Sequence, residues 1–217
     1  MQAIEQLHHS RAVTLGRRLE LLTIVWTATE AGLGLWSAWQ AHALSLAAFG
    51  LDSLIELASA AALLWRLQHQ HDPHRREFAE RRSLRIAAIC LLALAAYVLV
   101  GAVLQLRSGA PSTANLLGIV VTASAVLLMP LLARSKRRVA ALLDSDAMLA
   151  DSRQADFCAL QALIVLLGLV VTRWWNVTWA DSAAALLLVP LIAREGIRAL
   201  QGQSCGCTSN TCSSRTA

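Results

Sequence analysis

The sequence has little charge for its length. Of its 217 residues, 15% are Asp, Glu, Lys or Arg, whereas 56% are hydrophobic. A soluble globular domain is typically about 25% charged and about 45–50% apolar. The composition therefore argues against an ordinary soluble domain and indicates a membrane protein.

Little of the chain lies outside long apolar stretches. A helix needs about 20 mostly apolar residues to cross a hydrocarbon core about 30 Å thick, and six stretches are long enough. They cover residues 20–40, 43–66, 84–106, 115–134, 149–172 and 177–195. We therefore predict an all-α membrane protein, a bundle of six transmembrane helices over residues 20–200. An N-terminal segment, 1–19, precedes it and a cysteine-containing tail, 201–217, follows it.

The first stretch lacks the features of a cleaved signal peptide. It is too long for the apolar region of such a peptide, and no small-residue cleavage site closes it. We expect this stretch to be retained as the first membrane span.

Positive charge is scarce in one set of connections. The loops after the first, third and fifth spans hold only Arg107 and Arg173, whereas the loops after the second and fourth spans and the N-terminal segment are rich in arginine. The positive-inside rule then places both termini in the cytoplasm. Tryptophans, which favour the membrane interface, gather at the opposite face: Trp36, Trp39, Trp174, Trp175 and Trp179. The net charge of +5 follows from this bias and is not a nucleic-acid footprint.

Two carboxylates interrupt the second apolar stretch. Residues 49–59 read FGLDSLIELAS and place Asp52 and Glu56 four residues apart, on one face of a helix. A carboxylate near the bilayer centre costs about 2.5–3.5 kcal/mol or more. The oxygens of two such groups suit a divalent metal ion. The alternative is a hydrogen-bonded pair between helices with one carboxyl protonated.

The fifth stretch begins with a polar stripe. In ADSRQADFCALQAL, Asp151, Gln154, Cys158 and Gln161 share one helical face, and Asp156 lies well around the helix from Asp151. We predict Asp151 and Asp156 as further metal ligands. The alternatives are that Asp151 begins the helix at headgroup level and that Cys158 is a small buried hydrophobe.

Other polar residues are candidates for a proton relay or for lining the site. Glu30 lies within the first stretch, where a single hydrogen bond between helices is the alternative. Asp181 opens the sixth stretch, where an acid in the first turn also complements the helix dipole. Gln154 and Cys158 complete this set.

Histidine and cysteine cluster outside the predicted spans. Close cysteines in a reducing cytosol more often hold metal than form disulfides. For the histidines, a solvated polar connector is the alternative. The candidate auxiliary metal ligands are His69, His71 and His74 in one loop and Cys205, Cys207 and Cys212 in the tail.

Taken together, the six predicted spans, SLAAFGLDSLIELAS and ADSRQADFC resemble the cation diffusion facilitator (cation efflux) family over about residues 15–200. The resemblance implies proton-coupled export of divalent metals, typically zinc, with Asp52 and Glu56 as ligands. The family's usual second-span pair is two aspartates or a histidine and an aspartate. Its fifth span usually has a histidine and an aspartate four apart, which matches Ser152 and Asp156, unless Asp151 is the ligand. The chain is similar to a short bacterial branch that lacks the cytoplasmic C-terminal domain.

We therefore expect an integral protein of the bacterial cytoplasmic membrane that exports zinc or a similar ion, and not an enzyme. No cofactor is expected, because the metal ion is the transported substrate. A site without histidine selects zinc less strictly, so cobalt, cadmium, iron and manganese stay open. The expected partners are lipid, metal ions and protons, with a second copy of the chain as a candidate and no nucleic acid. The alternatives are a non-transporting membrane metal-binding or sensing protein and a carrier of small organic cations.

Overall fold

The computed structural model describes four stretches of the chain, residues 2–68, 73–109, 112–143 and 146–201. Within them, side chains are described except at residues 2–13, 59, 62–68, 73–84, 146–147 and 150. These stretches form six α-helices and no strand. The helices are α1 (Gln2–Ala41), α2 (Leu44–Gln68), α3 (Pro73–Ser108), α4 (Leu116–Leu143), α5 (Asp146–Trp175) and α6 (Ala180–Leu200).

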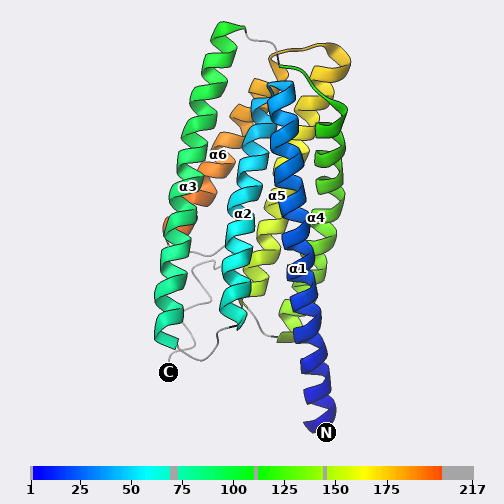
Figure 1. Cartoon of the computed structure of the whole chain (residues 1–217), viewed down its shortest axis with the longest axis vertical. Helices are drawn as coiled ribbons and strands as arrows, with labels where there is room; N and C mark the ends of the chain where they lie inside the picture. Colours follow the sequence, from blue (N-terminus) through cyan, green and yellow to red (C-terminus); the bar gives the residue numbers. More distant parts are fainter. Residues whose placement is uncertain (1, 69–72, 110–111, 144–145, 202–217) are drawn as a thin grey trace.

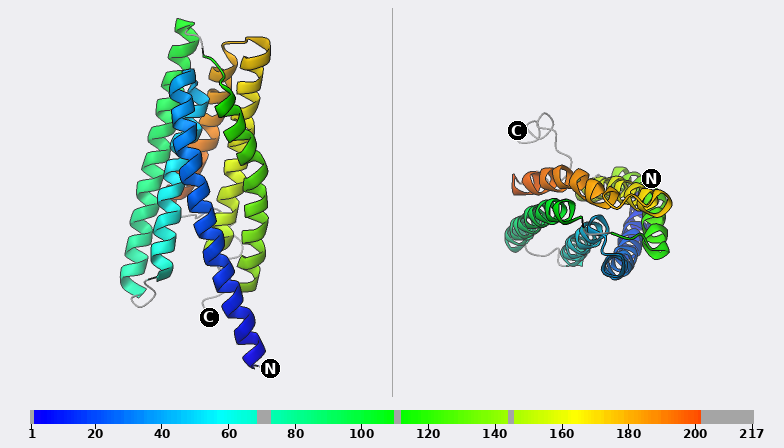
Figure 2. Two further views of the ribbon diagram at one scale, coloured as in Figure 1. Left: turned by 45° about the vertical axis from the view of Figure 1, so that its right-hand side comes forward. Right: turned by 90° about the horizontal axis from the view of Figure 1, so that it is seen from above.

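The six helices lie side by side along one long axis and alternate in direction (Figure 1). The most extensive packing joins α4 with α5, α3 with α6, and α1 with α2. Helix α2 also packs against α3, α5 and α6, so it lies inside the bundle (Figure 2). Much of α2 therefore meets other helices, although Leu54 on its outer side is 42% exposed.

The two ends of the bundle differ in composition. The end with the α1–α2 and α5–α6 connections, the Trp-rich end, has five exposed indoles: Trp36, Trp39, Trp174, Trp175 and Trp179. The opposite end, the Arg-rich end, carries basic residues of α1, α4 and α6: Arg17, Arg18, Arg134, Arg138, Arg194 and Arg198. The predicted segregation of indoles from positive charge is thus present in the fold.

Three helices of the described chain are long and apolar enough to cross a membrane: residues 85–108, 116–143 and 151–175. The protein is therefore an integral membrane protein. Helices α1, α2 and α6 contain buried carboxylates, which lower their hydropathy: Glu20, Glu30, Asp52, Glu56, Asp181 and Glu195. These carboxylates face other helices rather than lipid, as intramembrane charged groups do.

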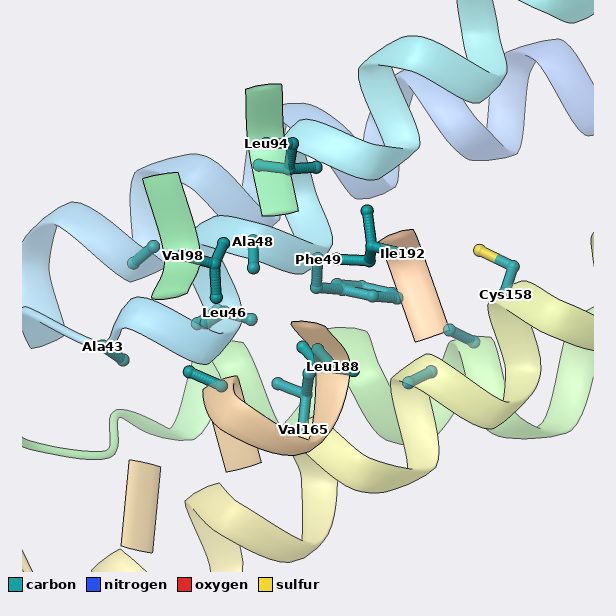
Figure 3. Packing of buried hydrophobic residues seen from close by; sticks show 14 of the residues in the cluster. Ala43, Leu46, Ala48, Phe49, Leu94, Val98, Cys158, Val165, Leu188 and Ile192 are labelled. Carbon is teal, nitrogen blue, oxygen red and sulfur yellow. The ribbon is translucent and has the colours of Figure 1, made fainter. Parts of the chain in front are cut away.

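The core is built around Phe49 of α2, whose side chain is fully buried. Leu188 and Ile192 of α6 lie next to its ring, with Cys158 of α5 beyond them (Figure 3). Small residues let the helices approach closely. A Cβ on Gly168 of α5 would meet the Cβ of Ala184 of α6 at 2.7 Å, so glycine is required at this crossing.

The predicted stretches agree with the helices at the Trp-rich end, whereas at the Arg-rich end the helices continue beyond them. Helix α1 begins at Gln2, so residues 2–19 continue the first helix. Helix α4 runs through Pro130 to Leu143, past the predicted end at 134. These extensions place part of the basic sequence on helices inside the bundle.

Candidate metal site

Asp52 and Glu56 both face the interior of the bundle. Their residues are 2% and 5% exposed. They belong to a buried face of α2 with a helical period: Ser45, Phe49, Asp52, Ser53, Glu56 and Ala60. Helix α2 packs against α1, α3, α5 and α6, and the face of FGLDSLIELAS that carries the two carboxylates is directed into the core.

Helix α5 supplies two polar neighbours for this pair. Gln161 lies beside Asp52, and Cys158 lies beside Glu56; both neighbours are buried. Neither amide atom of Gln161 makes a hydrogen bond of normal geometry. The predicted stripe on α5 therefore does face the two carboxylates.

Two carboxylate oxygens of this pair have no hydrogen-bond partner within the described chain. They are Asp52 Oδ2 and Glu56 Oε2, each buried and unpaired. Buried polar groups are nearly always hydrogen-bonded, and an unpaired one indicates a missing water or ion. The two lone oxygens lie one helical turn apart on one face, an arrangement able to bind a cation.

Glu30 of α1 and Glu195 of α6 extend the negative charge. Glu30 interacts electrostatically with Glu56 and Asp52, and both of its carboxyl oxygens are buried without a hydrogen-bond partner. Glu195 is buried and interacts electrostatically with Asp52. Sequence reasoning did not select Glu195, although its phase with Leu188 and Ile192 marks it as inward-facing.

Asp151 belongs to a different cluster. It accepts a hydrogen bond from Lys136 of α4, which also donates to Glu20 of α1 at 3.4 Å. Asp151 interacts electrostatically with Glu56, so the clusters are neighbours. Neither Lys136 nor Glu20 was selected from the sequence, where Lys136 stood in the basic run of residues 134–138.

Asp156 lies on the partly exposed side of α5. It pairs with Arg137 of α4, and the two side chains are 43% and 40% exposed. The structure therefore does not bring Asp156 together with Asp52 and Glu56. The physical reason is the helical angle, because Asp156 lies well around α5 from the stripe that faces α2.

Asp181 is hydrogen-bonded to the first turn of α2. Its carboxylate accepts hydrogen bonds from the backbone N–H groups of Leu44, at 2.7 Å, and Ser45, at 3.2 Å, and from the Ser45 hydroxyl. These are free donors of the first turn of α2. Asp181 also lies in the first turn of its own helix α6, as expected, so its carboxylate is near the N-terminal ends of both α6 and α2.

The remaining candidates divide as follows. Gln154 is half-buried on α5 and engaged in contacts. His69, His71, Cys205, Cys207 and Cys212 lie outside the described residues, and His74 is in α3 without a described side chain. Among the described residues, no three His, Cys, Asp or Glu side chains lie close enough to hold a metal ion together. The Asp52–Glu56 pair with the Gln161 amide is thus the candidate site.

Comparison with known protein families matches residues 21–201 to the cation efflux transmembrane domain. The match covers helices α2 to α6 and the second half of α1, including the parts of α1, α2 and α5 that carry Glu30, Asp52, Glu56, Asp151 and Gln161. A search of curated proteins finds no match.

Proposed function

The chain belongs to the cation efflux family, and from this premise we propose that it exports divalent metal ions from the cytoplasm through the Asp52–Glu56 site. The family makes it a cation transporter of the membrane. The observation that carries the metal site is the pair of buried, unpartnered oxygens, Asp52 Oδ2 and Glu56 Oε2. A cation between them would compensate charge that the described protein groups leave open.

The ion is zinc or a similar divalent metal in this proposal. Carboxylate and amide oxygens from Asp52, Glu56 and Gln161 accept zinc, but they suit manganese and cobalt as well. The Cys158 thiol beside Glu56 adds a softer donor that favours zinc or cadmium over manganese. Substrate competition among these four ions measures how far the thiol contributes.

Protons are the proposed coupling ions. A carboxylate must lose its proton to bind a metal, so protons and metal ions compete for Asp52 and Glu56. With the Arg-rich end in the cytoplasm, metal binds from that side. Protons that arrive from the Trp-rich end displace the metal ion from the two carboxylates. The protonated pair then becomes accessible from the Arg-rich end again.

Flux in proteoliposomes with an imposed pH gradient tests this function. We expect one or more of zinc, cobalt, cadmium and manganese to move with the gradient, and the double variant Asp52→Asn/Glu56→Gln to move none. The triple variant Cys205→Ser/Cys207→Ser/Cys212→Ser separates transport from binding by the tail and should keep the flux. No flux of any metal, together with metal binding that the tail variant abolishes, would instead identify a membrane-anchored metal-binding protein.

A further inference from the structure

Lys136 is buried although its neighbours in the sequence are not. Arg134 and Arg138 are exposed and Arg137 is partly exposed, whereas Lys136 is fully buried. Its Nζ bridges two carboxylates from different helices, Glu20 of α1 and Asp151 of α5. We call these three residues the lysine cluster.

The charge of the lysine cluster does not balance. Two carboxylates face one ammonium, so a unit of negative charge is left over when both acids are ionised. In addition, Glu20 Oε1 is fully buried and has no hydrogen-bond partner among the described residues. Such an excess is costly in a low-dielectric interior, and a divalent cation would neutralise both acids where the ammonium neutralises one.

The lysine cluster lies between the Asp52–Glu56 pair and the Arg-rich end. With a rise of about 1.5 Å per residue, Glu56 is about 18 Å along α2 from the Trp-rich end, whereas Lys136 is about 30 Å along α4 and Glu20 about 30 Å along α1. Glu56 nevertheless interacts electrostatically with both Lys136 and Asp151. An ion moving from the Arg-rich end to Glu56 would therefore meet this cluster first.

Lysine is the side chain suited to such a position. Its ammonium is a compact charge on a flexible four-carbon stem, whereas an arginine would hold a carboxylate with a rigid fork of donors. The ammonium can thus leave the two acids by rotation of its own stem.

We propose that Glu20 and Asp151 form a second divalent-cation site, which the ammonium of Lys136 fills as a tethered cation until a metal ion displaces it. As a step on the path to Asp52 and Glu56, this site rests on the proposed transport function. Its existence as a binding site does not, because it follows from the geometry of Glu20, Lys136 and Asp151.

Manganese binding to the purified full chain in detergent tests the site. Free Mn²⁺ is counted by its electron paramagnetic resonance signal, and its preference for oxygen ligands limits binding by cysteine. In the Asp52→Asn/Glu56→Gln background, the further change Lys136→Met should add one bound ion per chain, because it empties the site of its tethered cation. Adding Glu20→Gln and Asp151→Asn should remove that ion again, whereas Arg137→Met in place of Lys136→Met should add none.

A second variant keeps the positive charge at this position. Lys136→Arg should bind both acids more firmly and raise the KM for metal flux about tenfold at an unchanged maximal rate. A purely structural ion pair predicts no added manganese for Lys136→Met and an unchanged KM for Lys136→Arg, and this pair of results would overturn the proposal. Failure of the transport function itself would look different, since wild-type liposomes would then show no flux while the manganese count still changed.

Discussion

The bundle holds two groups of buried acids that solve the same electrostatic problem differently. At Asp52 and Glu56, two acids share a face of α2, no described basic side chain pairs with them, and one oxygen of each has no partner. At Glu20 and Asp151, which lie nearer the Arg-rich end, the chain provides the ammonium of Lys136 as a counter-charge. Because burying an uncompensated charge costs several kcal/mol, the first group depends on a proton or a cation from outside. In the second group, the ammonium of Lys136 compensates most of the negative charge.

If Asp52 and Glu56 bind the transported ion as proposed, the difference shows how a transporter can distinguish a substrate site from a structural contact. A site that must bind and release an ion cannot contain a permanent counter-charge of full strength. A contact that holds α1, α4 and α5 together benefits from one. The lysine cluster lies between these extremes, because its single positive charge leaves one acid in excess.

The largest expected effect comes from removing the uncompensated pair. Asp52→Asn/Glu56→Gln should lower metal flux about 100-fold or more, since even supporting residues of metal sites are worth 10–100-fold. Flux is measured in proteoliposomes under a pH gradient.

The matched control for this change is Ser53→Ala on the same buried face of α2. The Ser53 hydroxyl donates to the carbonyl oxygen of Phe49 within its own helix, so its loss should leave flux within about twofold. An equal loss of flux in Ser53→Ala would mean that α2 is sensitive to any polar change, and the contrast between the two groups would fail.

The next effect concerns stability. Lys136→Met should lower the free energy of unfolding by about 3–5 kcal/mol, because it leaves the buried Glu20 and the largely buried Asp151 without a counter-charge. The triple variant Lys136→Met/Glu20→Gln/Asp151→Asn should recover most of that loss. Unfolding in mixed detergent measures both. An unchanged stability in Lys136→Met would contradict the burial of the lysine cluster.

A smaller effect is expected at the Trp-rich end. Asp181→Ala should cost about 1–2 kcal/mol, because the first N–H groups of α2 lose their acceptor. Asp181→Asn keeps one acceptor oxygen and should cost less. If both substitutions cost the same, the charge rather than the hydrogen bonds of Asp181 would stabilise α2.

The smallest effect is expected for the exposed pair. Arg137→Met should change the free energy of unfolding by less than about 1 kcal/mol, as is typical of ion pairs open to solvent. Compared with Lys136→Met, one position earlier on α4, it isolates the effect of burial from that of charge. Equal losses of unfolding free energy at positions 136 and 137 would mean that burial makes no difference to the effect of removing the charge.

The helical class and the second-span motif were predictable from the sequence, because apolar length and helical period decide them. The polar stripe on α5 was also visible, but the sequence did not decide which face of that helix looks inward. The family match confirms the resemblance on which the expected function rested. Lys136 was missed because the positive-inside rule assigns a basic run to a loop. A signal was present nonetheless, since Met129, Leu132, Lys136 and Val139 share one buried face of α4.

Pairing between helices was the part that the sequence could not decide. Asp151 and Asp156 are both acids near the start of α5, and which helix each one meets depends on packing with α4. Likewise, nothing local to Asp181 indicates that its partners are the amides of Leu44 and Ser45, more than 130 residues away. Such contacts follow from the tertiary arrangement of the bundle.

The most direct test is a structure of the protein loaded with zinc, with the ion located by its anomalous scattering. Our account predicts a peak between α2 and α5, about 2.0–2.2 Å from oxygens of both Asp52 and Glu56. No peak there, with zinc bound at Cys205, Cys207 and Cys212 instead, would contradict the assignment of the buried pair as the substrate site.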